Sequence, residues 1–166
     1  PDGRRIGLKG SIDRVDRTRD GRLVVTDHKS GGKDKFKDLS ADDPTAGGSL
    51  FQLPSYAAAA RARFGTPDAP VLAEYGLLRK GDYARPGFVM TPDVDEKVSQ
   101  ALALVVEGIE TGFFPNRPER PGWRFFVGCH YCEPDGLGTA ERWAEWERKH
   151  HDARLAPWFG TDEAAS

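Results

Sequence analysis

Residues 6–29 read IGLKGSIDRVDRTRDGRLVVTDHK, and this stretch decides the fold. Apolar and polar residues alternate from Ile6 to Asp16 and again from Leu23 to Lys29, which is the period of a half-buried β-strand. Between the two runs stands Asp20-Gly21, a pair that is typical of hairpin turns. The chain is therefore predicted to open with an antiparallel hairpin.

The length of the hairpin loop determines which residues face each other across the two strands. A two-residue loop places Asp13 opposite His28 and leaves Asp13 and Asp27 on different faces. A three-residue loop, with Gly21 in the left-handed conformation of a bulge, places Asp13 opposite Asp27. We predict the three-residue loop. Lys29 then shares the face of both carboxylates, because residues two apart on a strand point the same way.

The rest of the chain predicts an α/β order of elements. The predicted elements are a helix over 50–64, strands over 72–78 and 87–90, a helix over 91–112 and a polar helix over 139–151. Residues 31–48 are rich in Lys, Asp and Gly, and we expect them to form an exposed loop. The predicted fold class is α/β, with a mixed central sheet, an antiparallel front hairpin, flanking helices and a C-terminal tail that carries the cysteines.

Composition and charge exclude few functions. The chain has 166 residues, of which 38% are hydrophobic and 30% charged, as in a soluble globular protein of one domain. Its formal net charge is −2, but residues 1–40 hold 11 basic and 7 acidic side chains, so a nucleic-acid partner is not excluded. The longest apolar run, Ala101–Val106, is far shorter than the about 20 residues that span a bilayer. We expect a cytoplasmic protein with no membrane partner.

Two facing carboxylates beside a lysine suit metal-assisted cleavage of a phosphodiester. Asp13 and Asp27 would repel each other unless a cation lies between them, and oxygen ligands suit Mg²⁺ or Mn²⁺. Such an ion neutralises the phosphate and lowers the pKa of a bound water, while Lys29 stabilises the developing negative charge. On spacing alone, exposed strand ends with ordinary charge pairing explain these three residues equally well.

Three motifs in register resemble the nuclease domain of the RecB-like exonucleases, which belong to the PD-(D/E)XK superfamily. They are Gly10-Ser11-Ile12-Asp13-Arg14-Val15-Asp16, Asp20-Gly21-Arg22-Leu23-Val24-Val25-Thr26-Asp27-His28-Lys29-Ser30-Gly31 and Gln52-Leu53-Pro54-Ser55-Tyr56. The resemblance implies a restriction-endonuclease-like core and a Mg²⁺- or Mn²⁺-dependent deoxyribonuclease. It further implies an exonuclease module of DNA repair or recombination, with DNA as substrate and a helicase subunit or fused helicase domain as partner.

The resemblance also implies the roles of residues at the end of the hairpin. Asp13, Asp27 and the backbone carbonyl of His28 would hold the metal ion. Asp13, Asp27 and Lys29 would carry the catalysis. The family usually has Tyr or Trp at the position of His28, and we expect this side chain to face away from Asp27, with little effect on the chemistry.

Four further residues are candidates for DNA binding. Gln52 and Tyr56, four apart on one helix, share a face and by the resemblance would line the site and contact DNA. Lys33 and Lys35 follow the hairpin and are candidate phosphate contacts, which would add affinity without sequence specificity. A solvated loop explains the two lysines almost as well.

The resemblance weakens in the tail that holds Cys129 and Cys132. Related nucleases often bind an iron–sulfur cluster through one upstream cysteine and three spaced C-x-x-C-x(5)-C, but Gly138 stands at the third position here. A remnant cluster with other ligands, a zinc ion or two free thiols packed by aromatic residues are the alternatives, and we favour free thiols. We divide the chain into a nuclease core, residues 1–128, and a tail, residues 129–166, within one structural domain.

The alternative function is a nuclease-fold module that binds DNA or a helicase partner without cutting. The family's leading helices, which often supply a further His or Glu to the metal site, are not found ahead of the first predicted strand. This fragment on its own could then be inactive. Retention of Asp13, Asp27 and Lys29 favours the enzyme, because a purely structural module has no need of two facing carboxylates and a lysine.

Overall fold

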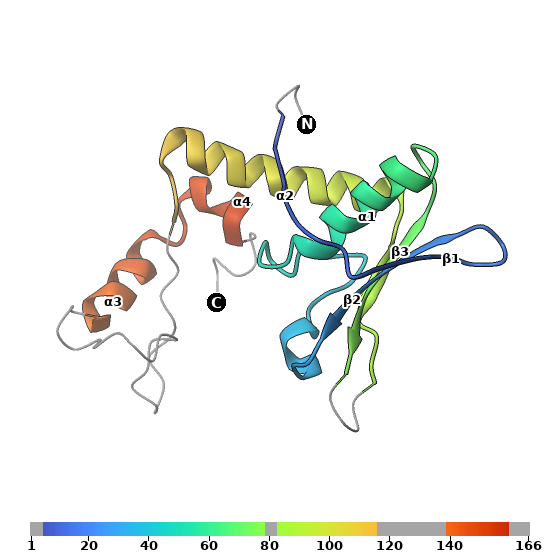
Figure 1. The fold of residues 1–166 in the computed structure, drawn as a ribbon. Coiled ribbons are helices and arrows are strands. Elements are labelled where there is room, and N and C mark those ends of the chain that lie inside the picture. Colours follow the sequence, from blue (N-terminus) through green and yellow to red (C-terminus); the bar gives the residue numbers. More distant parts are fainter. Residues whose placement is uncertain (1–4, 79–82, 116–138, 160–166) are drawn as a thin grey trace. The chain divides into compact units, whose positions relative to one another are not determined.

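The computed structural model describes residues 5–78, 83–115 and 139–159. The chain forms two compact units, one ending at Ala103 and the other beginning at Leu104. Figure 1 shows their elements coloured along the sequence.

A four-stranded mixed sheet in the order β1-β2-β3-β4 forms the base of the first unit (Figure 1). Its strands are β1 (Arg14–Arg17), β2 (Leu23–Lys29), β3 (Val71–Leu77) and β4 (Gly87–Met90). β1 and β4 run antiparallel to their neighbours, whereas β2 and β3 run parallel. Helix α1 (Gln52–Phe64) belongs to the crossover from β2 to β3. The architecture confirms the predicted α/β class with its antiparallel front hairpin.

The hairpin has the predicted three-residue loop. Arg17 pairs with Leu23, and the Thr18 N–H donates to the Arg22 carbonyl at 2.9 Å. Gly21 has a φ of +87°, the left-handed conformation that this loop requires and that glycine adopts without strain.

The first strand is shorter than the predicted run from Ile6, because the ladder begins only at Arg14. The register of the hairpin would pair the His28 N–H with the carbonyl of Ile12. Instead, the Asp13 carboxylate accepts this N–H at 2.8 Å, so the side chain takes the place of the next ladder bond. The preceding residues leave the sheet edge, and Gly10 lies against Tyr56 of α1.

The segment between β2 and α1 is more ordered than the exposed loop that we predicted. It contains a short 3₁₀-helix, η1 (Lys33–Phe36), and it buries Phe36 and Leu39. The Phe36 ring packs on Tyr75 of β3 with a centroid separation of 4.3 Å. The exposed loop was predicted from the polar composition of the segment, but two apolar residues within it are enough to hold it against the core.

Helices α1 and α2 (Pro92–Thr111) agree with the prediction. Helix α1 begins at Gln52 with Pro54 in its first turn, where a missing N–H does no harm. Helix α2 ends where Gly112 takes a φ of +67°. One core joins the sheet, α1 and the start of α2, and its buried side chains include Val25, Leu53, Ala57, Val71, Tyr75, Met90 and Val94.

The second unit holds the predicted polar helix, α3 (Thr139–Lys149), which ends two residues earlier than expected. The 3₁₀-helix η3 (Ala153–Leu155) and the short helix α4 (Ala156–Phe159) follow. Trp146 is buried and meets the Phe159 ring edge-on with a centroid separation of 5.0 Å. Cys129 and Cys132 lie outside the described residues. None of the helices that the structure describes is long and apolar enough to cross a membrane.

Candidate active site

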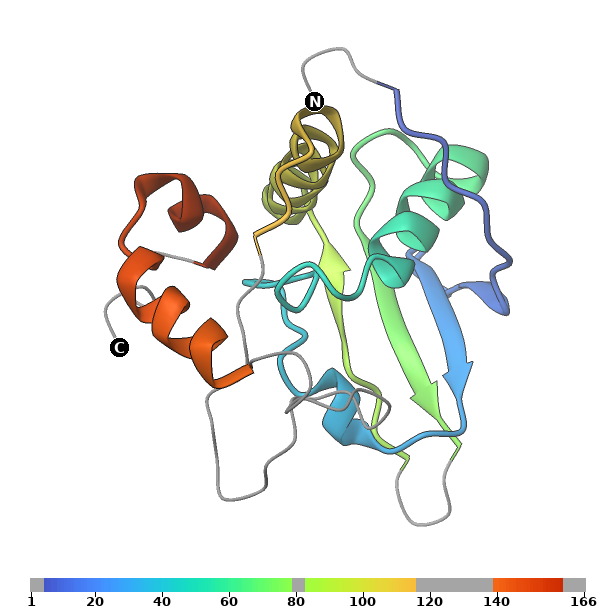
Figure 2. The same ribbon diagram turned by 90° about the vertical axis from the view of Figure 1, so that its left-hand side faces the viewer.

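The candidate site lies where β2 ends and α1 begins. Leu23, Val25 and Asp27 alternate along β2 and are buried on the sheet face that α1 covers. Figure 2 shows the chain leading from the end of β2 directly into η1, with α1 across the strands. A carboxylate that is only 3% exposed thus stands at the end of an apolar row.

Gln52 joins the two charged residues of β2. Its Nε2 donates to Asp27 Oδ1 at 2.9 Å, and its Oε1 accepts from Lys29 Nζ at 2.9 Å. If the amide were flipped, Oε1 would face the Asp27 carboxylate and the two oxygens would repel each other. Asp27 and Lys29 together therefore fix the orientation of the amide. The first residue of α1 therefore holds both groups in place.

Asp27 and Lys29 also form an ion pair. Lys29 Nζ lies 2.7 Å from Asp27 Oδ2, a buried oxygen that has this ion pair but no hydrogen-bond partner. The ammonium offsets part of the cost of burying this oxygen, which also has lone pairs available for another ligand.

Tyr56 is the fourth member of this network. Its hydroxyl oxygen accepts a hydrogen bond from Gln52 Nε2 at 3.1 Å, as expected for residues four apart on one helix. Because the oxygen accepts this bond, its own O–H can point toward another acceptor.

Tyr75, which sequence reasoning missed, lies beside the network. It pairs with Asp27 across the parallel β2–β3 ladder, and Lys29 Nζ lies 5.4 Å from the centroid of its ring, within cation–π range. Burial, with the negative charge of Asp27 as a second cause, raises the pKa of Tyr75 to about 12, so the phenol keeps its proton at neutral pH. The alternation of β3 shows that Tyr75 is inward, but only the strand pairing places it next to Asp27.

Asp13 lies at the exposed edge of the site. Its Oδ2 accepts from the His28 N–H and lies 3.9 Å from the Nδ1 of the His28 ring. The structure brings Asp13 to the same strand end as Asp27 but turns its carboxylate toward His28. The His28 ring faces away from Asp27, as expected, since a Cβ on Gly76 would lie 3.1 Å from its Cδ2.

The sequence of the chain matches a known family. The sequence model of the PD-(D/E)XK nuclease superfamily matches residues 2–135. This chain belongs to the PD-(D/E)XK nuclease superfamily. No curated protein and no solved structure matches it significantly. Members of this superfamily are generally nucleases that use divalent metals such as Mg²⁺ and act on DNA.

The donor set of the nuclease fits a hard divalent cation. Asp27 Oδ2 is a buried oxygen with no hydrogen-bond partner, and Asp13 adds a second carboxylate at the same strand end. The Lys29 carbonyl accepts from Leu78 on the β3 side at 2.9 Å, so the backbone groups of His28 point to the side of Asp13. Within the described ranges, no three His, Cys, Asp or Glu side chains gather as a metal site, and the His28 carbonyl is a candidate for a third ligand.

The two candidate DNA-binding lysines of the nuclease lie on η1. Lys33 and Lys35 are exposed, whereas Phe36 of the same turn is buried on Tyr75. Since Tyr75 is also the neighbour of Asp27, the Phe36–Tyr75 stack fixes the lysine-bearing turn beside the site.

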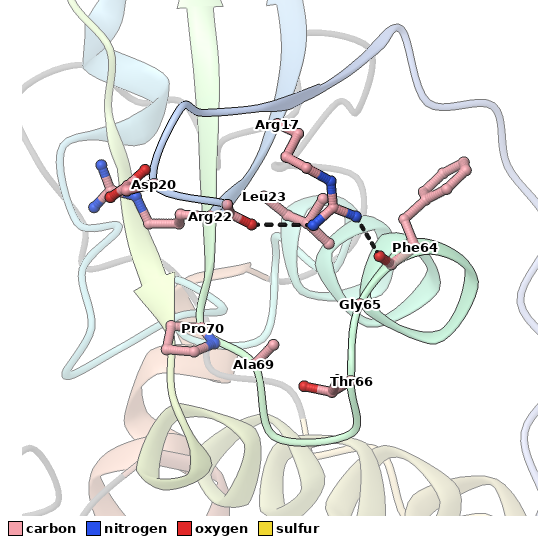
Figure 3. Close-up of a pocket in the computed structure, with 10 residues that line it drawn as sticks. Arg17, Asp20, Arg22, Leu23, Phe64, Gly65, Thr66, Ala69 and Pro70 are labelled. Carbon is pink, nitrogen blue, oxygen red and sulfur yellow. Dashed lines mark hydrogen bonds between the residues drawn. The ribbon is translucent and has the colours of Figure 1, made fainter.

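A separate cavity of about 470 Å³ lies at the other end of β2, between the hairpin loop and the end of α1 (Figure 3). Arg17 lines it, but this guanidinium donates to the carbonyls of Gly21 and Phe64 and ties the hairpin to the helix. The cavity contains none of the candidate site residues.

Proposed function

We propose that this nuclease hydrolyses DNA phosphodiester bonds with Mg²⁺ or Mn²⁺, as a RecB-like exonuclease module of DNA repair or recombination. The observation that carries the proposal is the buried carboxylate of Asp27, which is joined to Lys29 directly and through Gln52. Lys29 Nζ lies 2.7 Å from this buried carboxylate, and a lysine ammonium is a suitable partner for the negative charge of a phosphoryl group.

Each group has a defined task in this proposal. Asp13, Asp27 and the His28 carbonyl would hold the ion, which when bound neutralises the phosphate and lowers the pKa of a water. Lys29 stabilises the negative charge that develops on the phosphoryl oxygens, and Gln52 orients its ammonium.

The exonuclease assignment and a helicase subunit or fused helicase domain as partner rest on the resemblance of the three motifs to RecB-like proteins. Tyr56 would donate its hydroxyl hydrogen to the DNA backbone. Gln52 has its amide hydrogens on Asp27 and Tyr56, so we assign it to positioning rather than to the DNA contact that we predicted.

Incubation of the full natural polypeptide with end-labelled DNA tests the function. We expect Mn²⁺ or Mg²⁺ to support cleavage of linear DNA to short products, and a chelator to abolish it. Circular single-stranded DNA is the control, because an exonuclease requires an end. Equal cleavage of the circle would overturn exonuclease action, and absence of any cleavage would overturn the enzyme.

A second candidate is a module that binds DNA or a helicase partner without cutting. It is favoured by the lack, among the described side chains, of a third metal-ligating group near Asp13 and Asp27. In that case the same assay would show DNA retained but uncut.

Lys33 and Lys35 provide a test of the DNA-binding surface. Removing both by substitution to Ala is expected to reduce the slope of log affinity against log salt by about 1.5, since each phosphate contact contributes about 0.7–0.9. Fluorescence anisotropy with a labelled oligonucleotide at several salt concentrations measures the slope.

The control removes two exposed cations from the other end of β2, with Arg19→Ala and Arg63→Ala together. Seven strand residues separate the two ends, or about 20 Å. An equal loss of slope in both double variants would mean that charge anywhere on the unit suffices, and the assignment of η1 would then be wrong.

A further inference from the structure

Gly10 makes an unusually close approach to a residue of the candidate site. A Cβ placed on Gly10 would lie 2.9 Å from Tyr56 Cε1 and 3.2 Å from the Tyr56 hydroxyl oxygen. Non-bonded carbon atoms in contact lie about 3.5–4.0 Å apart, so even a methyl group at this position requires the Tyr56 ring to move. Gly10 is not among the glycines with positive φ, so the backbone conformation does not require glycine here. The lack of space for a side chain does.

The contact matters because of what the Tyr56 hydroxyl touches. It accepts from Gln52 Nε2 at 3.1 Å, and the same amide nitrogen donates to Asp27 Oδ1 at 2.9 Å. The other end of the amide accepts from Lys29 Nζ. Displacement of the ring removes one of the two acceptors that orient Nε2, and the amide gains freedom to turn away from Lys29.

A second glycine in the same extended segment has no such neighbour. Gly7 lies three residues earlier, and a Cβ placed there would meet no atom within 4 Å. A Gly→Ala substitution makes the same chemical change at both positions and has a similar effect on the unfolded chain, but only at Gly10 does the new methyl group meet Tyr56.

We propose that Gly10 is a positioning residue of the site. Because it has no side chain, the Tyr56 ring can pack against its backbone, and Tyr56 in turn orients Lys29 and Asp27 through Gln52. The consequence for cleavage rests on the proposed function, whereas the seating of the ring does not. Gly10 itself touches neither the substrate nor the ion in this proposal. It acts on the chemistry through Tyr56.

A double-mutant cycle tests the coupling. Gly10→Ala is expected to lower kcat about tenfold in the wild-type background, as for the loss of one hydrogen bond in the network, with little change in KM. In a Tyr56→Leu background, where no phenol remains to be displaced, the same substitution is expected to have no further effect. Gly7→Ala is expected to leave kcat unchanged in both backgrounds.

A spectroscopic readout makes the test independent of activity. The chain has four tyrosines, so a protein carrying ¹³C-labelled tyrosine gives few ring signals, and the one lost in Tyr56→Leu belongs to Tyr56. We expect Gly10→Ala to shift that signal and Gly7→Ala to leave it in place, with unchanged melting temperatures.

The outcomes separate the two proposals. An unmoved Tyr56 signal, or an equal loss of kcat in the wild-type and Tyr56→Leu backgrounds, overturns the role of Gly10. A shifted signal in a protein that cuts no DNA supports the seating of the ring and overturns the nuclease activity instead.

Discussion

Asp27→Asn is expected to reduce DNA cleavage about 10³-fold or more with little loss of folded structure. The substitution keeps the shape of the side chain and an oxygen that can accept from Gln52 Nε2, which now lies 2.9 Å from Oδ1. It removes the negative charge of the one buried carboxylate in the proposed metal set. A neutral amide binds a divalent cation far more weakly than a carboxylate does.

Three measurements check this prediction. Single-turnover cleavage gives the loss of rate, titration calorimetry with Mn²⁺ gives the loss of metal affinity, and thermal unfolding shows that the fold persists. We expect the first two to fall together, since the same carboxylate is needed for both.

Glu74→Gln is the matched control. Glu74 is a carboxylate on neighbouring strand β3 and is 6% exposed, close to the 3% of Asp27. Its Oε1 accepts from Thr26 Oγ1 at 3.1 Å and pairs with Arg85, on the sheet face away from α1. Wild-type cleavage by Asp27→Asn, or an equal loss in Glu74→Gln, would show that Asp27 has no special role.

The hairpin could be predicted from the sequence because its signals are local. Gly21 defines the loop, and the loop defines the register that brings Asp13 to the strand end that holds Asp27. The position of Gln52 and Tyr56 on one helix face likewise follows from their spacing. These relations connect residues within one hairpin or one turn of helix.

The remaining features of the site depend on contacts between distant segments. Tyr75 lies beside Asp27 only because β3 pairs in parallel with β2 after the α1 crossover. Phe36 is buried by stacking on that same residue, so the expectation of an exposed loop was wrong for Phe36 for the same reason. Neither pairing leaves a local signal in the sequence.

The bond from the His28 N–H to Asp13 could not be predicted either. The hairpin pattern runs smoothly through Ile12, and nothing in it marks where a side chain replaces a backbone acceptor. Because the Asp13 side chain takes the place of the backbone acceptor, β1 begins only at Arg14. The residues before it turn toward α1, where Gly10 contacts Tyr56. The local departure from the ideal hairpin therefore brings the glycine of the first motif to the site.

Lys29→Met is expected to lower the rate of cleavage about 10²–10³-fold while metal binding is retained or strengthened. The ammonium stabilises charge on the phosphoryl group, so its loss acts on the rate. The same ammonium lies 2.7 Å from Asp27 Oδ2, the oxygen proposed for the metal, and so competes with the ion for it. Methionine keeps much of the length of the side chain and removes this competition.

Comparison of Asp27→Asn with Lys29→Met tests whether the two members of the ion pair have different roles. Loss of Asp27 is expected to weaken Mn²⁺ binding and cleavage together, whereas loss of Lys29 is expected to separate them. Lys97→Met is the matched control, because its side chain is 32% exposed against 33% for Lys29 and is paired with Asp93 at 3.0 Å. Weaker Mn²⁺ binding in Lys29→Met would make the lysine an organiser of the carboxylate instead of a partner for the phosphate. Full activity in Lys29→Met would mean that Lys29 has no role in the mechanism. Another cation would then have to stabilise the negative charge on the phosphoryl oxygens.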